Sequence, residues 1–185
     1  MALIGDDAIT LASPILGRSS ITMAQARAAW AQHATQTLDV NYTPAEVDEI
    51  ITRYITGCAQ LGIDALVALA QLALETTWLT SSWSAPPRRN PAGIGVTGEP
   101  GAGIRFPAWD LAVVAHLGRL LAYALPWGAG TQTQKAAIAA ALAWRPLPDT
   151  RRGIATTVGG LVGTWAVDPE YGKSLIRVAA QIRPA

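Results

Sequence analysis

The sequence has little cysteine and little histidine. Cys58 is the only cysteine among 185 residues, which excludes an internal disulfide and a cluster of thiolate metal ligands. His33 and His116 stand far apart and no H-E-x-x-H motif occurs, so we expect no zinc site, and no metal or organic cofactor. Cys58 falls on the apolar side of an expected helix, where a lone cysteine belongs to the core more often than it acts as a nucleophile.

Charge is also scarce. Charged residues make up 15% of the chain, and 14 Lys and Arg oppose 13 Asp and Glu for a formal net charge of +1. The basic residues never form a run longer than the pairs at 88–89 and 151–152. Because phosphate binding needs a concentrated basic surface, we expect no nucleic-acid partner.

No segment has the pattern of a secretion signal or a membrane span. The first twenty residues lack a positively charged start and carry Asp6 and Asp7 instead, which argues against a secretory signal. The longest apolar run, residues 111–125, is interrupted by His116 and Arg119 and is too short to cross a bilayer. We therefore expect a soluble monomer without a membrane partner.

Apolar residues, in contrast, are abundant. Half of the 185 residues are hydrophobic, and a chain of this length is about one domain long. We expect a mobile N-terminal tail over residues 1–20 and one compact domain over residues 21–185.

Helix signals follow one another along most of that domain. The strongest stand around residues 44–61, where Thr43 is an N-cap, Glu46 completes a capping box and Gly62 ends the helix. Asp64 caps the next segment, residues 64–78, whose apolar side chains point in nearly every direction, as in a helix buried on most sides. Further helices are expected over residues 23–34, 108–125, 133–144, a short part of 151–165, and 169–182 with Asp168 as its cap.

Residues 81–107 are rich in Ser, Pro, Gly and Asn. Two short β-like pieces, 93–96 and 104–106, are separated by a glycine-rich turn and predict a small hairpin lobe over 88–107. The expected fold class is therefore mostly α with a small β contribution (α+β). Residues 93–98 fit G-x-G-x-x-G, but no strand precedes them and no helix follows, so these glycines form turns and not a dinucleotide site.

One carboxylate, Glu75, interrupts the apolar helix at 64–78. Charged groups are seldom buried without a partner. Glu75 therefore either pairs with an arginine such as Arg88, Arg105 or Arg119, or points into solvent, or lines a cleft. In a cleft, partial desolvation and the nearby helix C-terminus favour the protonated form. A carboxylic acid of that kind suits protonation of a glycosidic oxygen.

Four segments, residues 68–78, 90–96, 106–123 and 165–178, resemble in the same order the successive motifs of the glucosaminidase domains of glycoside hydrolase family 73. These domains cleave peptidoglycan on a lysozyme-like fold. The resemblance implies a lysozyme-like helical domain with a small β-hairpin lobe and a substrate groove between the two.

The resemblance also assigns roles to single residues. Glu75 matches the catalytic acid, and Asn90 and Ile94 match the motif that opens the β-lobe. Trp109 matches the aromatic residue after the following strand, and Tyr171 matches a tyrosine that approaches the catalytic centre. We expect Glu75 and Tyr171 to be catalytic, and Asn90, Ile94 and Trp109 to bind substrate.

The chain contains seven tryptophans, and the apolar faces of sugar rings stack on aromatic side chains. Trp78 follows the catalytic-acid motif, and Trp165 stands where a tyrosine is common in the family. We expect both to bind substrate, although a core position suits each of them as well.

A second catalytic group is needed beside Glu75. Among the remaining acids Glu99, in the expected hairpin turn, is the first candidate, because the family can place an acidic residue there; a solvated turn glutamate is the alternative. Two carboxylates would give inversion or retention according to their separation. With Glu75 alone, the 2-acetamido group of the substrate attacks its own anomeric carbon with help from Tyr171.

The expected function is hydrolysis of the β-1,4 bond after N-acetylglucosamine in bacterial cell-wall peptidoglycan. The alternatives are a muramidase or lytic transglycosylase that uses the same glutamate, and a non-catalytic wall-binding or phage structural module. Such an enzyme acts at the cell wall, either outside the cell or after release by a phage.

Overall fold

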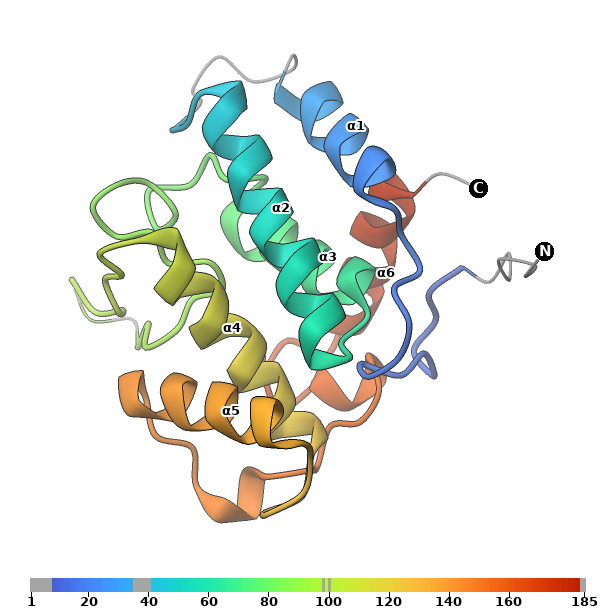
Figure 1. Ribbon diagram of the computed structural model, residues 1–185, viewed down its shortest axis with the longest axis vertical. Helices are drawn as coiled ribbons and strands as arrows, with labels where there is room; N and C mark the ends of the chain where they lie inside the picture. The colour runs from blue at the N-terminus through green and yellow to red at the C-terminus, as the bar shows by residue number, and fades with distance from the viewer. Residues whose placement is uncertain (1–7, 35–40, 98, 100, 184–185) are drawn as a thin grey trace.

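The computed structural model describes residues 8–34, 41–97, 99 and 101–183. These residues form six α-helices and two short 3₁₀ helices, and the fold is mostly α, as the sequence predicts (Figure 1). The elements in chain order are α1 (Met23–Ala34), α2 (Pro44–Leu61), α3 (Ala65–Thr76), α4 (Trp109–Ala124), α5 (Gln132–Trp144), η1 (Asp149–Arg151), η2 (Gly159–Leu161) and α6 (Tyr171–Ile182).

Local capping fixes the ends of α2. The Thr43 hydroxyl accepts the Glu46 N–H at 3.3 Å, and the Glu46 carboxylate accepts the Thr43 N–H at 2.8 Å, which completes the predicted capping box. At the other end Gly62 adopts φ 66°, a left-handed conformation that glycine reaches without strain. The predicted boundaries of this helix are therefore confirmed.

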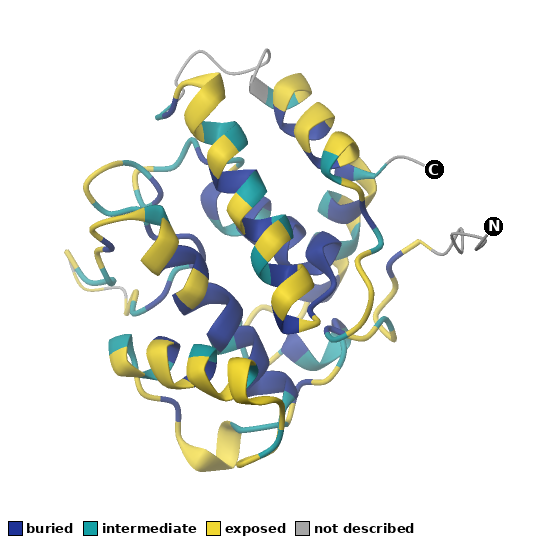
Figure 2. Ribbon diagram, in the orientation of Figure 1, coloured by how far each residue is buried: buried dark blue, intermediate teal, exposed yellow. Residues whose placement is uncertain are grey.

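Helix α3 is the central helix of the molecule. Ten of its twelve residues are buried, and it packs against α2 and α6 (Figure 2). The Asp64 carboxylate caps it by accepting the Leu66 N–H at 3.0 Å. Helix α3 therefore cannot shift without disturbing the core, and this fixes the position of Glu75 near its carboxyl end.

Helices α4 and α5 lie side by side and pack closely (Figure 1). Gly118 makes this approach possible, because a Cβ atom there would lie 2.2 Å from the Ala137 carbonyl oxygen. Helix α4 also packs against α2 and so connects α5 to the rest of the domain. None of the described helices is both long and apolar enough to cross a membrane.

The expected β-hairpin over 88–107 is wrong for the described residues, which form turns and no strand there. A single backbone hydrogen bond, from Ile104 N–H to the Ile94 carbonyl at 2.8 Å, joins the two predicted strands. Gly93 and Gly95 adopt φ of 61° and 79°, which breaks an extended strand. The Asn90 side chain also forms hydrogen bonds with the Ile94 carbonyl and N–H, so these backbone groups bond to a side chain in place of a full ladder between strands.

Two other helical predictions need correction. In place of a short α-helix, the segment 151–165 contains the 3₁₀ helix η2, and the 3₁₀ helix η1 ends at its first residue. Helix α6 begins at Tyr171, later than predicted, because the Asp168 carboxylate accepts the Glu170 N–H at 2.9 Å and closes a turn instead of capping a helix.

Residues 8–20 pack on the domain, which differs from the expected mobile tail. Ile15 is fully buried. Its N–H donates to the Thr156 carbonyl at 3.0 Å, and its carbonyl accepts the Asp64 N–H at 2.9 Å. The segment therefore bridges the start of α3 and the chain before α6; residues 1–7 of the predicted tail lie outside the described part.

Candidate active site

Glu75 is the second-last residue of α3 and is half-buried. It lines a cavity of about 270 Å³ together with the loop after α3 and the segment before α6. This Glu75 cavity is lined by Glu75, Trp83, Ala92, Gly93, Val96, Trp165 and Ala166. A Cβ atom on Gly93 would lie 3.5 Å from Glu75 Oε2, so the loop backbone comes close to that oxygen.

The surroundings of Glu75 favour its protonated form. Burial raises the pKa of the carboxyl group, and hydrogen bonds from Tyr171 and Trp165 act in the opposite direction without cancelling the rise. Among the described residues no arginine or lysine forms an ion pair with Glu75. The sequence leaves three alternatives for Glu75: an arginine partner, exposure to solvent, or a cleft. The geometry is that of an acid lining a cavity.

Tyr171 provides the shortest polar contact to Glu75. Its hydroxyl donates to Glu75 Oε1 at 2.7 Å and accepts from Gln71 Nε2 at 2.8 Å. Tyr171 is the first residue of α6 and is buried, which together with the neighbouring Glu75 raises its pKa well above the usual range. The tyrosine therefore stays neutral and donates to the carboxyl group.

The polar contacts continue into the core beyond the residues that sequence reasoning had selected. Gln71 Oε1 lies 2.8 Å from His116 Nε2, and His116 Nδ1 lies 2.8 Å from the Tyr54 hydroxyl. Gln71, His116 and Tyr54 are fully buried. One signal was present in the sequence: Gln71 stands four residues before Glu75 in an otherwise apolar helix, and this spacing places both on one face.

Asn90 and Ile94 organise the loop that forms one wall of the cavity. The fully buried Asn90 side chain donates to the Ile94 and Ile104 carbonyls at 2.8 and 3.1 Å, and accepts the Ala92 and Ile94 N–H groups at 3.3 and 2.9 Å. Ile94 packs in a small core cluster with Phe106. The Asn90 side chain supports the loop from within, Gly93 lines the Glu75 cavity, and Ile94 lines an adjoining cavity.

The tryptophans divide between this cavity and other places. Trp165 and Trp83 line the Glu75 cavity. Trp78 instead lines a separate cavity of about 300 Å³, where it packs edge-on against Trp30 at 4.8 Å and stacks on His33 at 3.6 Å. Trp109 packs edge-on against Tyr42 at 5.7 Å and lines none of the described cavities.

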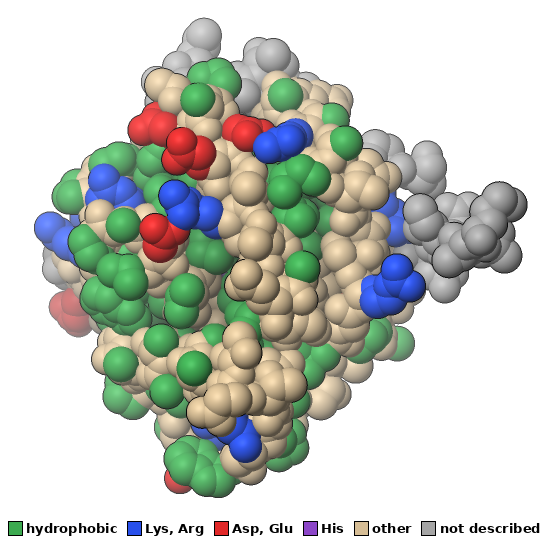
Figure 3. Space-filling model, in the orientation of Figure 1, with side chains coloured by type: hydrophobic (Ala, Val, Ile, Leu, Met, Phe, Trp, Pro, Cys, Tyr) green, Lys and Arg blue, Asp and Glu red, His purple; other side chains and the backbone are tan. Residues whose placement is uncertain are grey.

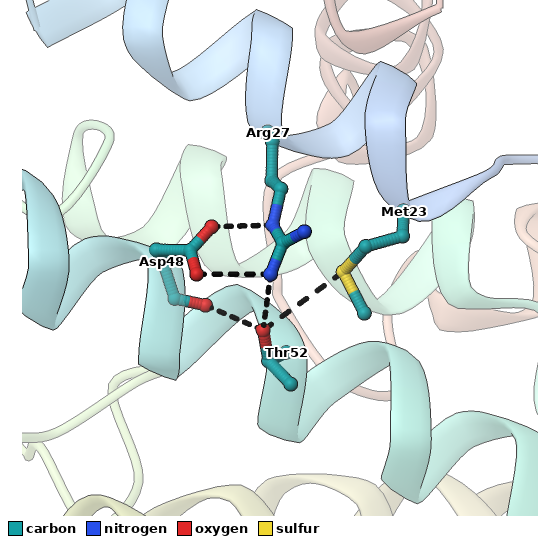
Figure 4. A network of polar contacts seen from close by, with 4 residues as sticks. All are labelled: Met23, Arg27, Asp48 and Thr52. Atoms are coloured by element: carbon teal, nitrogen blue, oxygen red, sulfur yellow. Dashed lines mark hydrogen bonds and ion pairs between the residues drawn. The ribbon is translucent and has the colours of Figure 1, made fainter.

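The Trp78 cavity lies against the contact between α1 and α2. Arg27, which lines it, donates to Asp48 Oδ2 at 2.9 Å and to the Thr52 hydroxyl at 3.3 Å (Figure 4). The Thr52 hydroxyl in turn donates to the Asp48 carbonyl at 2.8 Å and lies 3.9 Å from the Met23 sulfur. This arginine is therefore engaged within the protein.

Glu99 is exposed and does not line the Glu75 cavity. Its backbone carbonyl accepts the Ala102 N–H at 3.0 Å, while its two sequence neighbours lie outside the described residues. The structure thus brings Tyr171 and Trp165 to Glu75 but not Glu99. The described side chains contain no group of three or more His, Cys, Asp or Glu placed to hold a metal ion.

A third cavity, of about 210 Å³, adjoins the Glu75 cavity and shares Ala92, Gly93, Val96 and Trp165 with it. Arg119 and Arg145 line this arginine cavity, and among the described residues neither forms an ion pair with a carboxylate. On the face drawn in Figure 3, basic and acidic side chains are interspersed. The arginine cavity therefore offers two cations to an anionic group beside Glu75.

Comparison with known proteins gives one match. The model of the Glucosaminidase family, described as mannosyl-glycoprotein endo-beta-N-acetylglucosaminidase, matches residues 51–184. The matched span contains Glu75, Tyr171 and every residue that lines the two adjoining cavities. No curated protein and no solved structure matches the chain.

Proposed function

The chain belongs to the Glucosaminidase family of glycoside hydrolases, and we propose that it cleaves the β-1,4 bond after N-acetylglucosamine in bacterial peptidoglycan, with Glu75 as general acid. The family implies a polysaccharide that contains N-acetylglucosamine as substrate. We also propose that the helical domain is lysozyme-like, with the turn-rich segment after α3 as the second wall of the groove.

The observation that carries the proposal is the position of Glu75. Its carboxyl group has a raised pKa, borders a cavity and forms no ion pair among the described residues. A general acid must hold a proton near the working pH and reach the leaving oxygen. When the glycosidic bond breaks, the Glu75 proton passes to the leaving sugar oxygen, and the carboxylate that remains can later accept a proton from water.

In the mechanism that the geometry supports best, the second catalytic group beside Glu75 is the acetamido group of the substrate itself. Glu99 does not line the Glu75 cavity, and no other carboxylate does among the described residues. The acetamido oxygen attacks the anomeric carbon as the leaving oxygen takes the Glu75 proton. Water then opens the cyclic intermediate and returns a proton to Glu75. Tyr171 holds the carboxyl group in place throughout.

Peptidoglycan fits the site better than a neutral glycan does. The peptide stems of peptidoglycan carry carboxylates, and Arg119 and Arg145 line the cavity that adjoins Glu75. Arginine recognises carboxylates through charge-assisted hydrogen bonds. We also propose that the protein acts at the cell wall, either outside the cell or after release by a phage.

Digestion of purified peptidoglycan followed by mass spectrometry of the products tests this function. We expect N-acetylglucosamine at the new reducing ends, and no product from the Glu75→Gln variant. Glu49→Gln, at an exposed position of α2, is the matched control and should retain full activity. Glu99→Gln should also retain activity if the acetamido group is the second participant.

The same digestion separates the alternatives. N-acetylmuramic acid at the reducing end would identify a muramidase, and a 1,6-anhydro end would identify a lytic transglycosylase. Wall binding without any release of fragments by the parent chain would identify a non-catalytic module. Each of these three results contradicts the proposed function.

A further inference from the structure

A continuous chain of hydrogen bonds runs from the protein core to the carboxyl group of Glu75. It passes from Tyr54 on α2 to His116 on α4, then to Gln71 on α3, Tyr171 on α6 and finally Glu75. The four contacts measure 2.8, 2.8, 2.8 and 2.7 Å. The packing of the four helices does not require this chain of hydrogen bonds, because apolar side chains would fill the same volume without needing hydrogen-bond partners.

The donors and acceptors of this chain all point the same way. Gln71 Nε2 donates to the Tyr171 hydroxyl, so Gln71 Oε1 faces His116 and can only accept. His116 must therefore carry its proton on Nε2, and its Nδ1 accepts from the Tyr54 hydroxyl. Burial lowers the pKa of His116 to about 3, which keeps the ring neutral and leaves one nitrogen free to accept.

The reverse direction is less favourable because of Tyr54. If every bond were reversed, His116 Nδ1 would donate to the Tyr54 oxygen, and the Tyr54 hydroxyl proton would need another acceptor. Within the described part of the chain, its hydroxyl bonds only to His116. A fully buried donor without an acceptor is unfavourable, because it has lost its hydrogen bond to water and gained none in return.

The direction of the chain decides which oxygen of Glu75 holds the acidic proton. Tyr171 already donates to Oε1, so the proton of the neutral acid belongs on Oε2, the oxygen that lies toward Gly93 in the wall of the cavity. We propose that Gln71, His116 and Tyr54 are positioning residues that keep the Tyr171 hydroxyl donating to Oε1 and thereby present the proton on Oε2 to the substrate.

This inference rests on the proposed role of Glu75 as general acid. The groups that face Glu75 are Tyr171 from α6, Trp165 from the segment before it and Gly93 from the loop after α3. The adjoining arginine cavity contributes two cations, Arg119 and Arg145.

His116 itself contacts Tyr54, Gln71 and, at 5.6 Å between ring centroids, Trp165. Beyond Tyr54, the Cys58 thiol is the next titratable group, and burial raises its pKa, so it is neutral. The chain thus contains no charged member other than ionised Glu75.

The histidine tautomer is the first test and does not depend on activity. Long-range ¹H–¹⁵N NMR reports which ring nitrogen carries the proton, and the protein has only two histidines to assign. We expect a neutral His116 with its proton on Nε2 from pH 8 to pH 5. A proton on Nδ1, or a ring that is charged at pH 5, would overturn the inference.

The second test uses Gln71→Leu, which keeps the side-chain size and removes both hydrogen bonds. Without the Gln71 donor, the Tyr171 hydroxyl is no longer fixed in orientation and holds Oε1 less firmly, so the proton of the acid is no longer confined to Oε2. We expect kcat to fall about 10- to 100-fold with little change in KM. The alkaline limb of the pH profile should move to higher pH, because ionised Glu75 loses part of the Tyr171 hydrogen bond that stabilises it.

Gln134→Leu is the matched control, since it makes the same substitution and removes a 2.8 Å hydrogen bond to the Leu61 carbonyl far from Glu75. It should lower stability and leave kcat and the pH profile unchanged. If Glu75→Gln abolishes activity while Gln71→Leu behaves as the parent, the positioning role is wrong and the proposed function stands. If the parent itself is inactive, the proposed function fails, and the histidine tautomer still decides the direction of the chain.

Discussion

The Tyr171 hydroxyl donates a hydrogen bond of 2.7 Å to Glu75 Oε1, joining two residues that are 96 positions apart in the sequence. Helix α6 packs against α3, so this bond connects the first turn of one helix to the last turn of the other. A hydroxyl that donates to a carboxyl group favours its ionised form, whereas burial favours the neutral form. The acid strength of Glu75 is thus set by burial on one side and by the hydrogen bonds from Tyr171 and Trp165 on the other.

Replacing Tyr171 by Phe removes one of the two opposing hydrogen bonds and leaves the burial of Glu75 unchanged. The pKa of Glu75 should rise further, so the alkaline limb of kcat/KM should move to higher pH. We also expect kcat to fall, since the carboxyl group loses its support. Rates on peptidoglycan between pH 5 and pH 9 measure both effects; a limb that moves to lower pH would contradict the explanation.

Arg145→Gln should weaken the binding of anionic substrate. We expect KM on peptidoglycan to rise about 10-fold, which corresponds to the loss of one charge-assisted hydrogen bond. Neutral chito-oligosaccharides should be cleaved as before, because they offer no carboxylate to the arginine cavity. Arg151→Gln, at an exposed position, is the control. An equal effect on both substrates would argue against recognition of charge.

Asn90→Ala should destabilise the loop that forms the cavity wall. The Ala92 and Ile94 N–H groups and the Ile104 carbonyl lose their side-chain partner, at about 1–3 kcal/mol for each buried group left unpaired. Urea unfolding measures the loss. Asn41→Ala provides a comparison, since it removes two bonds of 2.9 Å at a half-buried position and should have a smaller effect.

Gly118→Ala should force α4 and α5 apart, because the new Cβ would meet the Ala137 carbonyl oxygen at 2.2 Å. We expect a loss of about 1–3 kcal/mol, typical of overpacking. Gly57→Ala is the matched control within α2: its Cβ would meet only the end of the Leu117 side chain at 2.8 Å, which can move. The gain in helix propensity should then make Gly57→Ala nearly neutral.

Stability should fall in acid because of His116. Burial lowers its pKa from 6.5 to about 3, so between these pH values the unfolded chain binds a proton that the folded chain does not. The free energy of unfolding should therefore decrease as the pH drops, by at most about 1.4 kcal/mol per pH unit from this group. Glu75, with its raised pKa, contributes with the opposite sign and loses stability as the pH rises.

Urea unfolding at several pH values between 7 and 4.5 measures this dependence. The comparison is best made in a Glu75→Gln background, where the opposite contribution is absent. His116→Gln should show a smaller decrease than its parent. An equal decrease in both proteins would assign the acid sensitivity to other groups.

The helices could be predicted from the sequence because their signals are local. Thr43, Glu46, Gly62 and Asp64 act within a turn of their own position, and the structure places each of them as predicted. The lobe after α3 could not be predicted in the same way. Its sequence pattern predicts two strands. In the structure, however, the Asn90 side chain forms hydrogen bonds with the Ile94 backbone, and glycines with positive φ turn the backbone.

The site shows the same division. Glu75 is visible in the sequence as one acid in an apolar helix, and the resemblance assigns Tyr171 beside it. The contacts of His116 and Tyr54 were not visible, because they depend on how α2, α3 and α4 pack. A lone histidine in an apolar run suggests a core position and gives no indication of its partners.

The packing of residues 8–20 has a practical consequence for anyone who shortens this protein. The family match begins at residue 51, inside α2. A fragment cut at that point would lose the first turns of α2, all of α1 and the Ile15 backbone that bonds to Thr156 and Asp64. A truncated version for crystallisation or for fusion to another protein should therefore start no later than residue 8.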